Sequence, residues 1–406
     1  MWEEFPPTPT GEWDAAIRAD LKGADYDKKL LWRTEEGIVV RPFYRVEDLP
    51  GTTGQARFAG SWQTASVGDI PQDGVRGDLL HEQGATAVQE LGYALAESQG
   101  KRKTFVFAVG TNYFFEIAKL RAARQLWARL SSEPLVIWAR TSMTDKSLYD
   151  PSANLMRCTT EAMSAIFGGC DFLVIENARF PEHLARSLGR ILREESHFEE
   201  VSDPGGGSYY IELLTASIAT EAWKVYESGL QGRDSAVAAA KAAKEKAVAQ
   251  RKRTLVGVNN YPDLNELLPG GASLPEGSWR MAEPFELIRQ RVEKSAKRPR
   301  VLLLQRGDVK MKMARANFCL NLFGCAGFQV KTSEKMEPAD LLVLCSSDAE
   351  YLSFAQDVCR QTKAPVIVAG NPKEQIEVLR AAGVKDFAYL GMDAVKFLSH
   401  WQEALS

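Results

Sequence analysis

Residues 302–318, LLLQRGDVKMKMARANF, lead from an apolar run into a charged turn and then into a helical pattern. The apolar residues complete a strand pattern, RVLLLQ, at 300–305. Strand, turn and helix in this order predict an α/β domain, and in open parallel domains ligands bind in the turn after a strand's carboxyl end. This turn carries Asp308, Lys310 and Lys312, so its residues determine what the domain could hold.

The same alternation continues to the C-terminus. Strand patterns at 300–305, 327–332, 340–347, 364–370 and 386–391 each precede a predicted helix. Five strands and five helices in about 110 residues are typical of the flavodoxin-like, doubly wound fold. We therefore predict a flavodoxin-like domain over 298–406, preceded by a linker over 268–297 that contains LPGGASLPEGS.

Residues 74–200 form a second alternating region. Strand patterns lie at 74–80, 104–110, 134–141 and 171–176, and helical patterns lie at 85–98, 114–130, 152–167 and 181–196. Alternation of this kind implies right-handed crossovers and a parallel sheet. A closed (β/α)₈ barrel needs about 250 residues. We therefore predict a partial (β/α) TIM-type barrel over 61–267, with a helical extension at 211–254.

The N-terminal 60 residues lack this alternation. They contain one short helical pattern, formed by Trp13, Ile17 and Leu21. A segment of this kind buries little surface by itself, so we predict that 1–60 is an arm that lies against something else.

The composition argues against several classes of partner. The formal net charge is -3, which disfavours nucleic acid or a membrane surface as the main partner. No apolar run approaches the roughly 20 residues of a membrane span, and the start, MWEEFPPTPTGEWDAA, lacks the pattern of a signal peptide. The six cysteines form no CxxC pair and are expected to be reduced and buried. These features predict a cytoplasmic protein.

For the remaining candidate residues we weigh a functional interpretation against a structural one. The four histidines (81, 183, 197 and 400) lack metal-ligand spacing, so no metal site is expected. The glycines of DPGGGSYYIE (203–212) could hold an anion, but Tyr209 and Tyr210 more simply anchor this turn against a neighbouring element. The basic end of the helical pattern at 236–253 could bind nucleic acid, although a solvated helix face is favoured.

A set of arginines lies on the helical pattern at 114–130, beside the apolar residues Leu120, Leu126 and Trp127. These arginines could hold a CoA phosphate or form structural salt bridges, and we favour salt bridges. They are Arg121, Arg124 and Arg129.

Several long stretches resemble the methylmalonyl-CoA mutase family, the adenosylcobalamin-dependent acyl-CoA mutases. They are GATAVQELGYALAE (84–97), VGTNYFFEIAKLRAARQLWARL (109–130), ARTSMTDKSLYDPSANLMRCTTEAMSAIFGG (139–169), DPGGGSYYIELLT (203–215) and RTLVGVNNY (253–261). The N-terminal arm (11–45) resembles that of the small subunit of the heterodimeric bacterial enzymes. In those enzymes the small subunit resembles the catalytic subunit but binds no cobalamin.

The resemblance gives a specific expectation for the turn after 300–305. Cobalamin-binding members carry D-x-H-x-x-G there, and the histidine gives a neutral nitrogen lone pair to cobalt. Here Asp308 occupies the Asp position, Lys310 the His position and Met313 the Gly position. A protonated lysine has no lone pair to donate. Met313 is expected to occupy the space that the family's glycine leaves open.

Two further family positions are also altered. The family's G-x-S-x-L corresponds to Leu344–Asp348, in which only the serine, Ser346, remains, and its Gly-Gly corresponds to Ala369-Gly370. We therefore regard Asp308, Lys310, Met313, Ser346 and Gly370 as degenerate positions and expect this chain to bind no cobalamin.

The barrel region differs from the catalytic members in a second way. The stretch 54–74 occupies the place of the whole first half of the barrel. Catalytic members also have a histidine before TSGWSL, where this chain has Ala139-Arg140 followed by Thr141, Ser142 and Met143. No catalytic residue is carried over from the family.

The resemblance thus predicts a non-catalytic small subunit of an adenosylcobalamin-dependent acyl-CoA mutase. Its partner is a catalytic large subunit that holds the cofactor, and methylmalonyl-CoA/succinyl-CoA isomerisation is the family default. Two alternatives stay open at this point. One is a mutase with a variant cobalamin site, and the other is a stand-alone remnant, possible as a homo-oligomer, that binds an acyl-CoA or serves as a scaffold.

Overall fold

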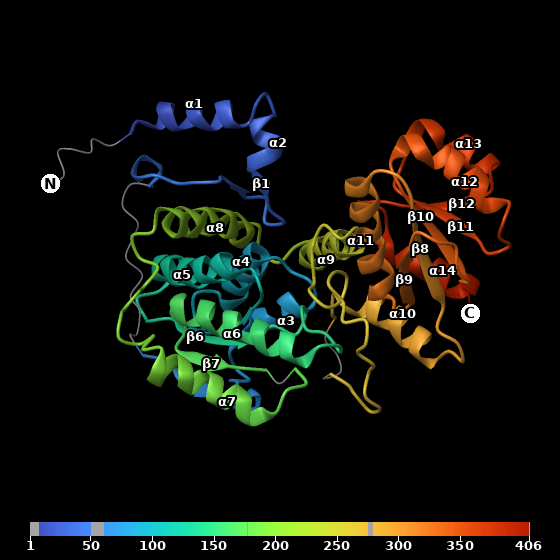
Figure 1. The fold of residues 1–406 in the computed structure, drawn as a ribbon. Helices are drawn as coiled ribbons and strands as arrows, with labels where there is room; N and C mark the ends of the chain where they lie inside the picture. Colours follow the sequence, from blue (N-terminus) through green and yellow to red (C-terminus); the bar gives the residue numbers. More distant parts are fainter. Residues whose placement is uncertain (1–7, 50–60, 177, 275–278, 406) are drawn as a thin grey trace.

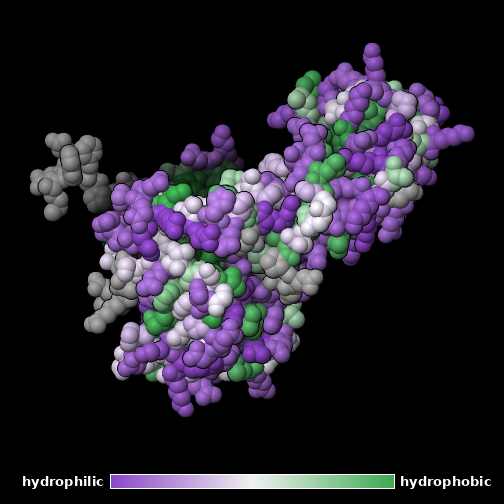
Figure 2. All heavy atoms as spheres, turned by 90° about the horizontal axis from the view of Figure 1, so that it is seen from below, coloured by the Kyte–Doolittle hydropathy of each residue, from purple (hydrophilic) through white to green (hydrophobic). Residues whose placement is uncertain are grey.

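The computed structural model describes residues 8–49, 61–176, 178–274 and 279–405. The chain forms two α/β units, each built on a five-stranded parallel sheet, and Figure 1 shows them as two lobes with α9 between them. Hydrophilic residues cover most of the face seen in Figure 2, and apolar residues are scattered among them. In the described part of the chain, no helix is long and apolar enough to cross a bilayer.

The first sheet has the order β3-β7-β6-β5-β4, and β4 to β7 lie in sequence order with a helix after each strand. This arrangement is consistent with part of a (β/α) barrel. Its elements are β3 (Gln63–Ala65), β4 (Val75–Arg76), α3 (Gly77–Glu82), α4 (Ala87–Ser98), β5 (Thr104–Val109), α5 (Tyr113–Leu130), β6 (Val136–Thr141), α6 (Pro151–Phe167), β7 (Phe172–Val174) and α7 (Glu182–Arg190), which continues into a π-helical turn (Ile191–Glu195).

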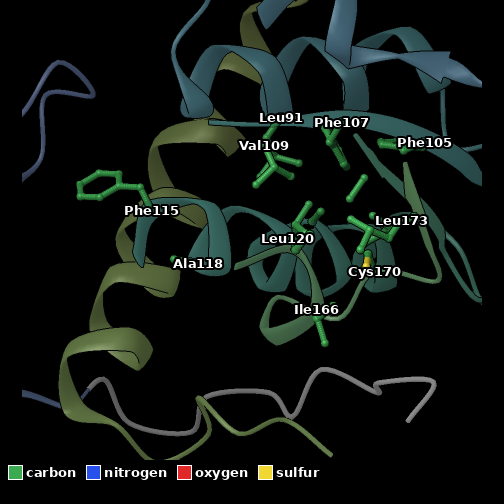
Figure 3. Close-up of a cluster of buried hydrophobic side chains, with 14 of the residues drawn as sticks. Leu91, Phe105, Phe107, Val109, Phe115, Ala118, Leu120, Ile166, Cys170 and Leu173 are labelled. Carbon is green, nitrogen blue, oxygen red and sulfur yellow. The ribbon is translucent and has the colours of Figure 1, made fainter. Parts of the chain in front are cut away.

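One face of this sheet packs against α4, α5 and α6. Phe105, Phe107 and Leu173 point from the strands into this layer, where they meet Leu91 and Leu120 from the helices (Figure 3). These side chains are fully buried. Each buried residue of this size contributes about 1.5–3 kcal/mol of transfer free energy, so this layer supplies much of the stability of the unit.

The opposite face is covered by residues from the stretch 61–74. Ile70 packs on Val106, Trp138 and Val174, and all four are buried. Trp138 also stacks on Phe172, with ring centroids 4.2 Å apart. In a closed barrel this face would point inward, so in this chain a short local segment takes the covering role.

Two features of the sheet were not expected from the sequence. β3 lies within the stretch 54–74 and pairs in parallel with β7, which adds a fifth strand. The strand predicted at 74–80 is wrong beyond Arg76, because Gly77–Glu82 forms α3. Asp78 lies in the first turn of α3, where a carboxylate is favourable, and it bonds to Arg76.

The helical extension consists of two helices, α8 (Tyr209–Ser228) and α9 (Arg233–Ala249). α8 lies along α4 and α5 and is covered in part by the N-terminal arm (Figure 1). The arm contains α1 (Thr10–Asp20), α2 (Tyr26–Leu30), a hairpin of β1 (Trp32–Arg33) and β2 (Val39–Val40), and a 3₁₀ turn (Val46–Asp48).

The arm is tied to the body by a few side chains. Tyr44 stacks on Tyr210 of α8, with centroids 5.2 Å apart. The Glu36 carboxylate accepts hydrogen bonds of 2.9 Å from the backbone N–H groups of Ala87 and Val88, at the start of α4. Neither α1 nor α2 has a buried residue, so the outer part of the arm contributes little to the core.

The second sheet has the order β12-β11-β10-β8-β9, with all neighbours parallel. Its elements are β8 (Arg300–Gln305), α11 (Val309–Cys325), β9 (Gln329–Ser333), β10 (Leu341–Cys345), a 3₁₀ turn (Asp348–Glu350), α12 (Tyr351–Cys359), β11 (Val366–Ala369), a 3₁₀ turn (Lys373–Gln375), α13 (Ile376–Ala381), β12 (Val384–Ala388) and α14 (Ala394–Leu405).

The segment expected to be a linker contains a further helix, α10 (Glu283–Lys294). Its residues Phe285, Ile288 and Val292 recur at helical spacing, are buried, and join the core that includes Val301 and Phe323. This apolar stripe makes α10 part of the second unit's core.

Candidate functional site

The turn after β8 does not form a ligand cradle. Asp308 is the N-cap of α11, and its carboxylate accepts a hydrogen bond of 2.8 Å from the Met311 N–H. Lys310 is exposed. Met313 was expected to occupy the space next to the backbone, but its side chain is 52% exposed on the second turn of α11. Asp308 therefore caps α11, and Lys310 and Met313 lie on its exposed surface.

The close-approach space beside this turn is filled from β10 and the turn that follows it. Gly307 has φ +79°, and the Glu350 carboxylate lies where a β-carbon on Gly307 would be. That carboxylate accepts hydrogen bonds from the hydroxyls of Ser346 (2.6 Å) and Ser347 (2.8 Å). The Ser346 hydroxyl lies also 2.8 Å from the Arg306 carbonyl oxygen. Ser346, the serine that the family pattern retains, thus binds the carboxylate of Glu350 from the same chain.

The space beside Gly370 is filled in the same way. Gly370 follows β11 with φ +147°, and the Arg315 guanidinium lies 2.8 Å from the position of a β-carbon there. Arg315 is held by Asp348, with an N–O distance of 3.1 Å. Sequence reasoning missed both Glu350 and Arg315, because they come from helical segments distant from the glycines.

Charged side chains of this chain thus lie beside both Gly307 and Gly370 at this edge of the sheet. No group of three or more His, Cys, Asp or Glu residues able to hold a metal ion occurs in the described part of the chain.

The carboxyl ends of the first sheet hold a second cluster, centred on Arg140. Arg140 occupies the place of the histidine in the catalytic pattern. It forms ion pairs with Asp78 (3.4 Å), Glu176 (3.5 Å) and Glu82; Arg140, Asp78 and Glu176 are buried, and the Glu82 side chain is 13% exposed. Burial raises the pKa of the Glu176 carboxyl, and the Arg140 charge opposes this shift. A permanently charged guanidinium held by three acids cannot take or give a proton.

A buried network lies next to Arg140. Lys119, on α5, is fully buried, and its ammonium lies 2.8 Å from Glu90 and 2.6 Å from Glu116. Glu90 also faces His81 at 3.4 Å, and the other ring nitrogen of His81 lies 3.0 Å from the Ser142 hydroxyl. Burial opposes ionisation of Glu90, but Lys119 and His81 outweigh it and lower the pKa of Glu90 to about 2.

A second buried lysine follows β6. The Lys146 ammonium lies 2.8 Å from Asp145 and 2.6 Å from Glu161. Burial raises the pKa of Glu161 well above its usual range, and the Asp145 carboxylate adds to this effect. The Lys146 charge outweighs the burial of Asp145 and lowers the pKa of Asp145 to about 2. The two acids thus share one lysine, and burial favours the protonated form of Glu161 more than that of Asp145.

A cavity of about 530 Å³ opens above these networks. Its floor is formed by the turns after β4, β5 and β6, and its walls are formed by the arm hairpin and by α9. Its lining includes His81, Glu116, Thr144, Asp145, Lys244 and Arg253. Cavities at the carboxyl ends of parallel strands are the usual ligand sites of such folds. The sequence did not single out this cavity.

The other candidates from the sequence have structural roles. Arg121 pairs with Asp203 and Glu212, and Arg124 pairs with Asp171 at 2.9 Å, so the preference for salt bridges at these two positions is confirmed. Arg129 lies over the ring of Trp223.

The glycine-rich turn at 203–212 is also occupied from within. Its Gly207 N–H donates to the Glu212 carboxylate, so an acid of this chain stands where an anion would bind. Tyr210 packs on Tyr44, which confirms the anchoring role expected for it. The cysteines are unpaired; five are buried and Cys359 is half-buried.

Comparison with known proteins identifies the family. A family model described as methylmalonyl-CoA mutase matches residues 59–297. The methylmalonyl-CoA mutase small subunit of Porphyromonas gingivalis is 28% identical, over 98% of this chain and 97% of the relative. The small subunit of Streptomyces virginiae is 32% identical, over 96% of this chain and 71% of the relative. The methylmalonyl-CoA mutase of Cereibacter sphaeroides is 35% identical over 231 residues, 46% of this chain and 33% of that protein.

The alignments also bear on the size of the first unit. The alignment with the Porphyromonas gingivalis protein spans 602 positions, whereas this chain has 406 residues. That protein therefore has segments without a counterpart here, in agreement with the small number of strands in the first sheet. With the family model covering more than half of the residues, the chain belongs to the methylmalonyl-CoA mutase family.

Proposed function

We propose that this chain is a non-catalytic small subunit of an adenosylcobalamin-dependent acyl-CoA mutase. In this proposal a catalytic large subunit holds the cofactor and isomerises methylmalonyl-CoA and succinyl-CoA, and this chain stabilises it. The observation that carries the proposal is the strand-end edge of the second sheet, where Glu350 and Arg315 occupy the space beside Gly307 and Gly370. The small-subunit names of the relatives support it.

The second unit fits a degenerate flavodoxin-like domain of the cobalamin-binding type. The strand order β9-β8-β10-β11-β12 supports this assignment, since it corresponds to the order 2-1-3-4-5 of flavodoxin-like sheets. In this interpretation the domain is retained for packing. Lys310 at the ligand position is the second reason to expect no cobalamin, because its ammonium offers cobalt no lone pair.

The ion pairs of Arg140 in the first unit support the proposal that this chain is not catalytic. Arg140 replaces an imidazole and is fixed by Asp78, Glu82 and Glu176. A group in this state cannot act as a general acid, which requires a proton that can leave.

The exposed apolar residues of the N-terminal arm support the proposal of a partner chain. Its exposed apolar side chains include Trp13, Trp32 and Val46, at 45%, 49% and 61% exposure, and helices α1 and α2 bury no residue of their own. A second chain would cover such surface. The reduced, mostly buried cysteines support a cytoplasmic location.

The test is co-expression with a catalytic large subunit of the same family. We expect one complex on size-exclusion chromatography at low and high salt, with the catalytic chain more resistant to heat in the complex than alone. Elution as two separate species at both salt concentrations would refute the proposal.

A second measurement separates the alternatives. Adenosylcobalamin added to this chain alone should leave the cofactor's absorption spectrum unchanged, whereas a shift to the base-off spectrum at micromolar concentration would favour a mutase with a variant site. The cavity of about 530 Å³, with cationic residues in its lining, favours a stand-alone acyl-CoA-binding remnant as the runner-up. That alternative predicts heat on titration with CoA thioesters and no complex with a large subunit.

A further inference from the structure

Lys244 is unusual among the buried lysines of this chain. It lies on α9 with 8% of its surface exposed and is part of the cavity lining. Its ammonium donates a hydrogen bond of 2.8 Å to the Ala85 carbonyl oxygen. Lys119 and Lys146, by contrast, each contact two carboxylates. Within the described ranges, no carboxylate lies within ion-pair distance of Lys244.

The nearby acids are held by other partners. Glu35 pairs with Arg253 at 3.0 Å, Glu36 binds the backbone at the start of α4, and Glu90 pairs with Lys119. Burial lowers the pKa of Lys244, and the Arg253 charge lowers it further, while Glu35, Glu36 and Glu90 oppose the shift. A lysine that is desolvated and next to another cation keeps a larger share of neutral, nucleophilic amine.

The cavity lining carries both signs of charge, with four acids (Glu35, Glu36, Glu116 and Asp145) beside its cations. Arg33 and Lys252 are exposed and line the cavity together with Arg253. Of these three, Arg253 is engaged with Glu35. The exposed cations Arg33 and Lys252 can attract an anionic molecule and hold its charged end. Lys244 lies in the cavity wall, where the other end of that molecule can reach it.

We propose that Lys244 is an acylation site for acyl thioesters that carry a second, free carboxylate. The choice of a dicarboxylic acyl thioester rests on the proposed function, since such thioesters are the substrates of the mutase complex. The carboxylate of the acyl group is held by the cations at the entrance, and the thioester carbonyl faces the amine of Lys244.

The reaction needs no further reagent. The neutral amine of Lys244 attacks the thioester carbonyl carbon, a C–N bond forms, and the C–S bond breaks. CoA leaves as the thiolate and takes up the proton that the amine releases. The products are an amide on Lys244 and free CoA.

The experiment uses the full-length chain alone with succinyl-CoA, followed by peptide mass spectrometry at a series of pH values. Lys246 is the matched control, because it lies on the same helix and is exposed. We expect faster succinylation of Lys244 than of Lys246 near neutral pH, and a rate–pH curve whose midpoint is shifted to lower pH for Lys244. An acetyl-CoA control, which lacks the second carboxylate, should label Lys244 more slowly.

Two variants sharpen the test. Lys244→Arg keeps the positive charge and should lose the modification, whereas Lys246→Arg should leave the labelling of Lys244 unchanged. Equal rates and equal pH midpoints for Lys244 and Lys246, or no labelling of Lys244 in the folded wild-type chain, would overturn the proposal. Because no partner chain is present, the result is independent of complex formation: a chain that is labelled but never co-elutes with a large subunit would refute the proposed function alone.

Discussion

Replacing Lys119 with methionine should strongly destabilise the first unit. Lys119 is fully buried and lies 2.8 Å from Glu90 and 2.6 Å from Glu116. The substitution leaves both carboxylates buried without their cation. Removal of one partner of a buried ion pair costs about 3–5 kcal/mol.

The pKa of Glu90 gives the pH dependence of this stability. Lys119 and His81 hold this pKa below its ordinary value, at about 2. The stability from this shift is therefore present above the ordinary pKa of a glutamate and is lost as the pH falls towards 2. Without the Lys119 charge, the pKa of Glu90 rises, so this contribution is lost already at higher pH.

The assay is urea unfolding followed by tryptophan fluorescence and circular dichroism at pH 7 and pH 5. We expect Lys119→Met to lower the free energy of unfolding by about 3–5 kcal/mol at pH 7, and to lower it less at pH 5, because Glu90 without the Lys119 charge accepts a proton more readily. Lys246→Met, at an exposed position of α9, is the control and should change stability by less than about 0.5 kcal/mol. A loss below about 1 kcal/mol for Lys119→Met would refute the reasoning, because the network would then not depend on its cation.

Three other predictions follow from the two clusters and the arm. Lys310→His restores an imidazole at the ligand position but should leave the spectrum of added adenosylcobalamin unchanged, because Glu350 and Arg315 still fill the space beside the glycines; a base-off spectrum with this single variant would contradict the steric argument. Arg140→Met should lower the free energy of unfolding by about 3–5 kcal/mol, since three acids lose their common cation, and an unchanged urea midpoint would count against the ion-pair cluster. Glu36→Gln should cost about 1 kcal/mol by weakening the contact with the α4 N-terminus and should speed proteolysis within the arm; equal cleavage rates for variant and wild type would show that the arm is held elsewhere.

Periodicity in the sequence located most of the regular elements, although it missed β3 and α10 and gave a strand where α3 lies. The alternation of apolar residues in Thr104–Val109 and the helical spacing in Tyr113–Leu130 are local properties, and both elements occur where they were expected. The strand-end turn after β8 was located for the same reason. That Lys310 does not bind cobalt stays a prediction from its chemistry alone.

The contacts that fill the sites could not be read from local patterns. Glu350 reaches Gly307 and Arg315 reaches Gly370 across more than 40 residues of sequence, and such pairs leave no periodic signal. The buried lysines were missed for a related reason. Lys119 looks like an ordinary charged residue of a surface helix, and only the fold brings Glu90, from another helix, to it.

The cover formed by Ile70 has a consequence for the newly synthesised chain. Half of a barrel would normally leave a wide apolar groove exposed, which favours aggregation with other nascent chains. Here Ile70, from the same chain, packs on Val106, Trp138 and Val174 and covers these apolar side chains. A newly made copy of this unit thus keeps these apolar side chains away from water with residues of its own.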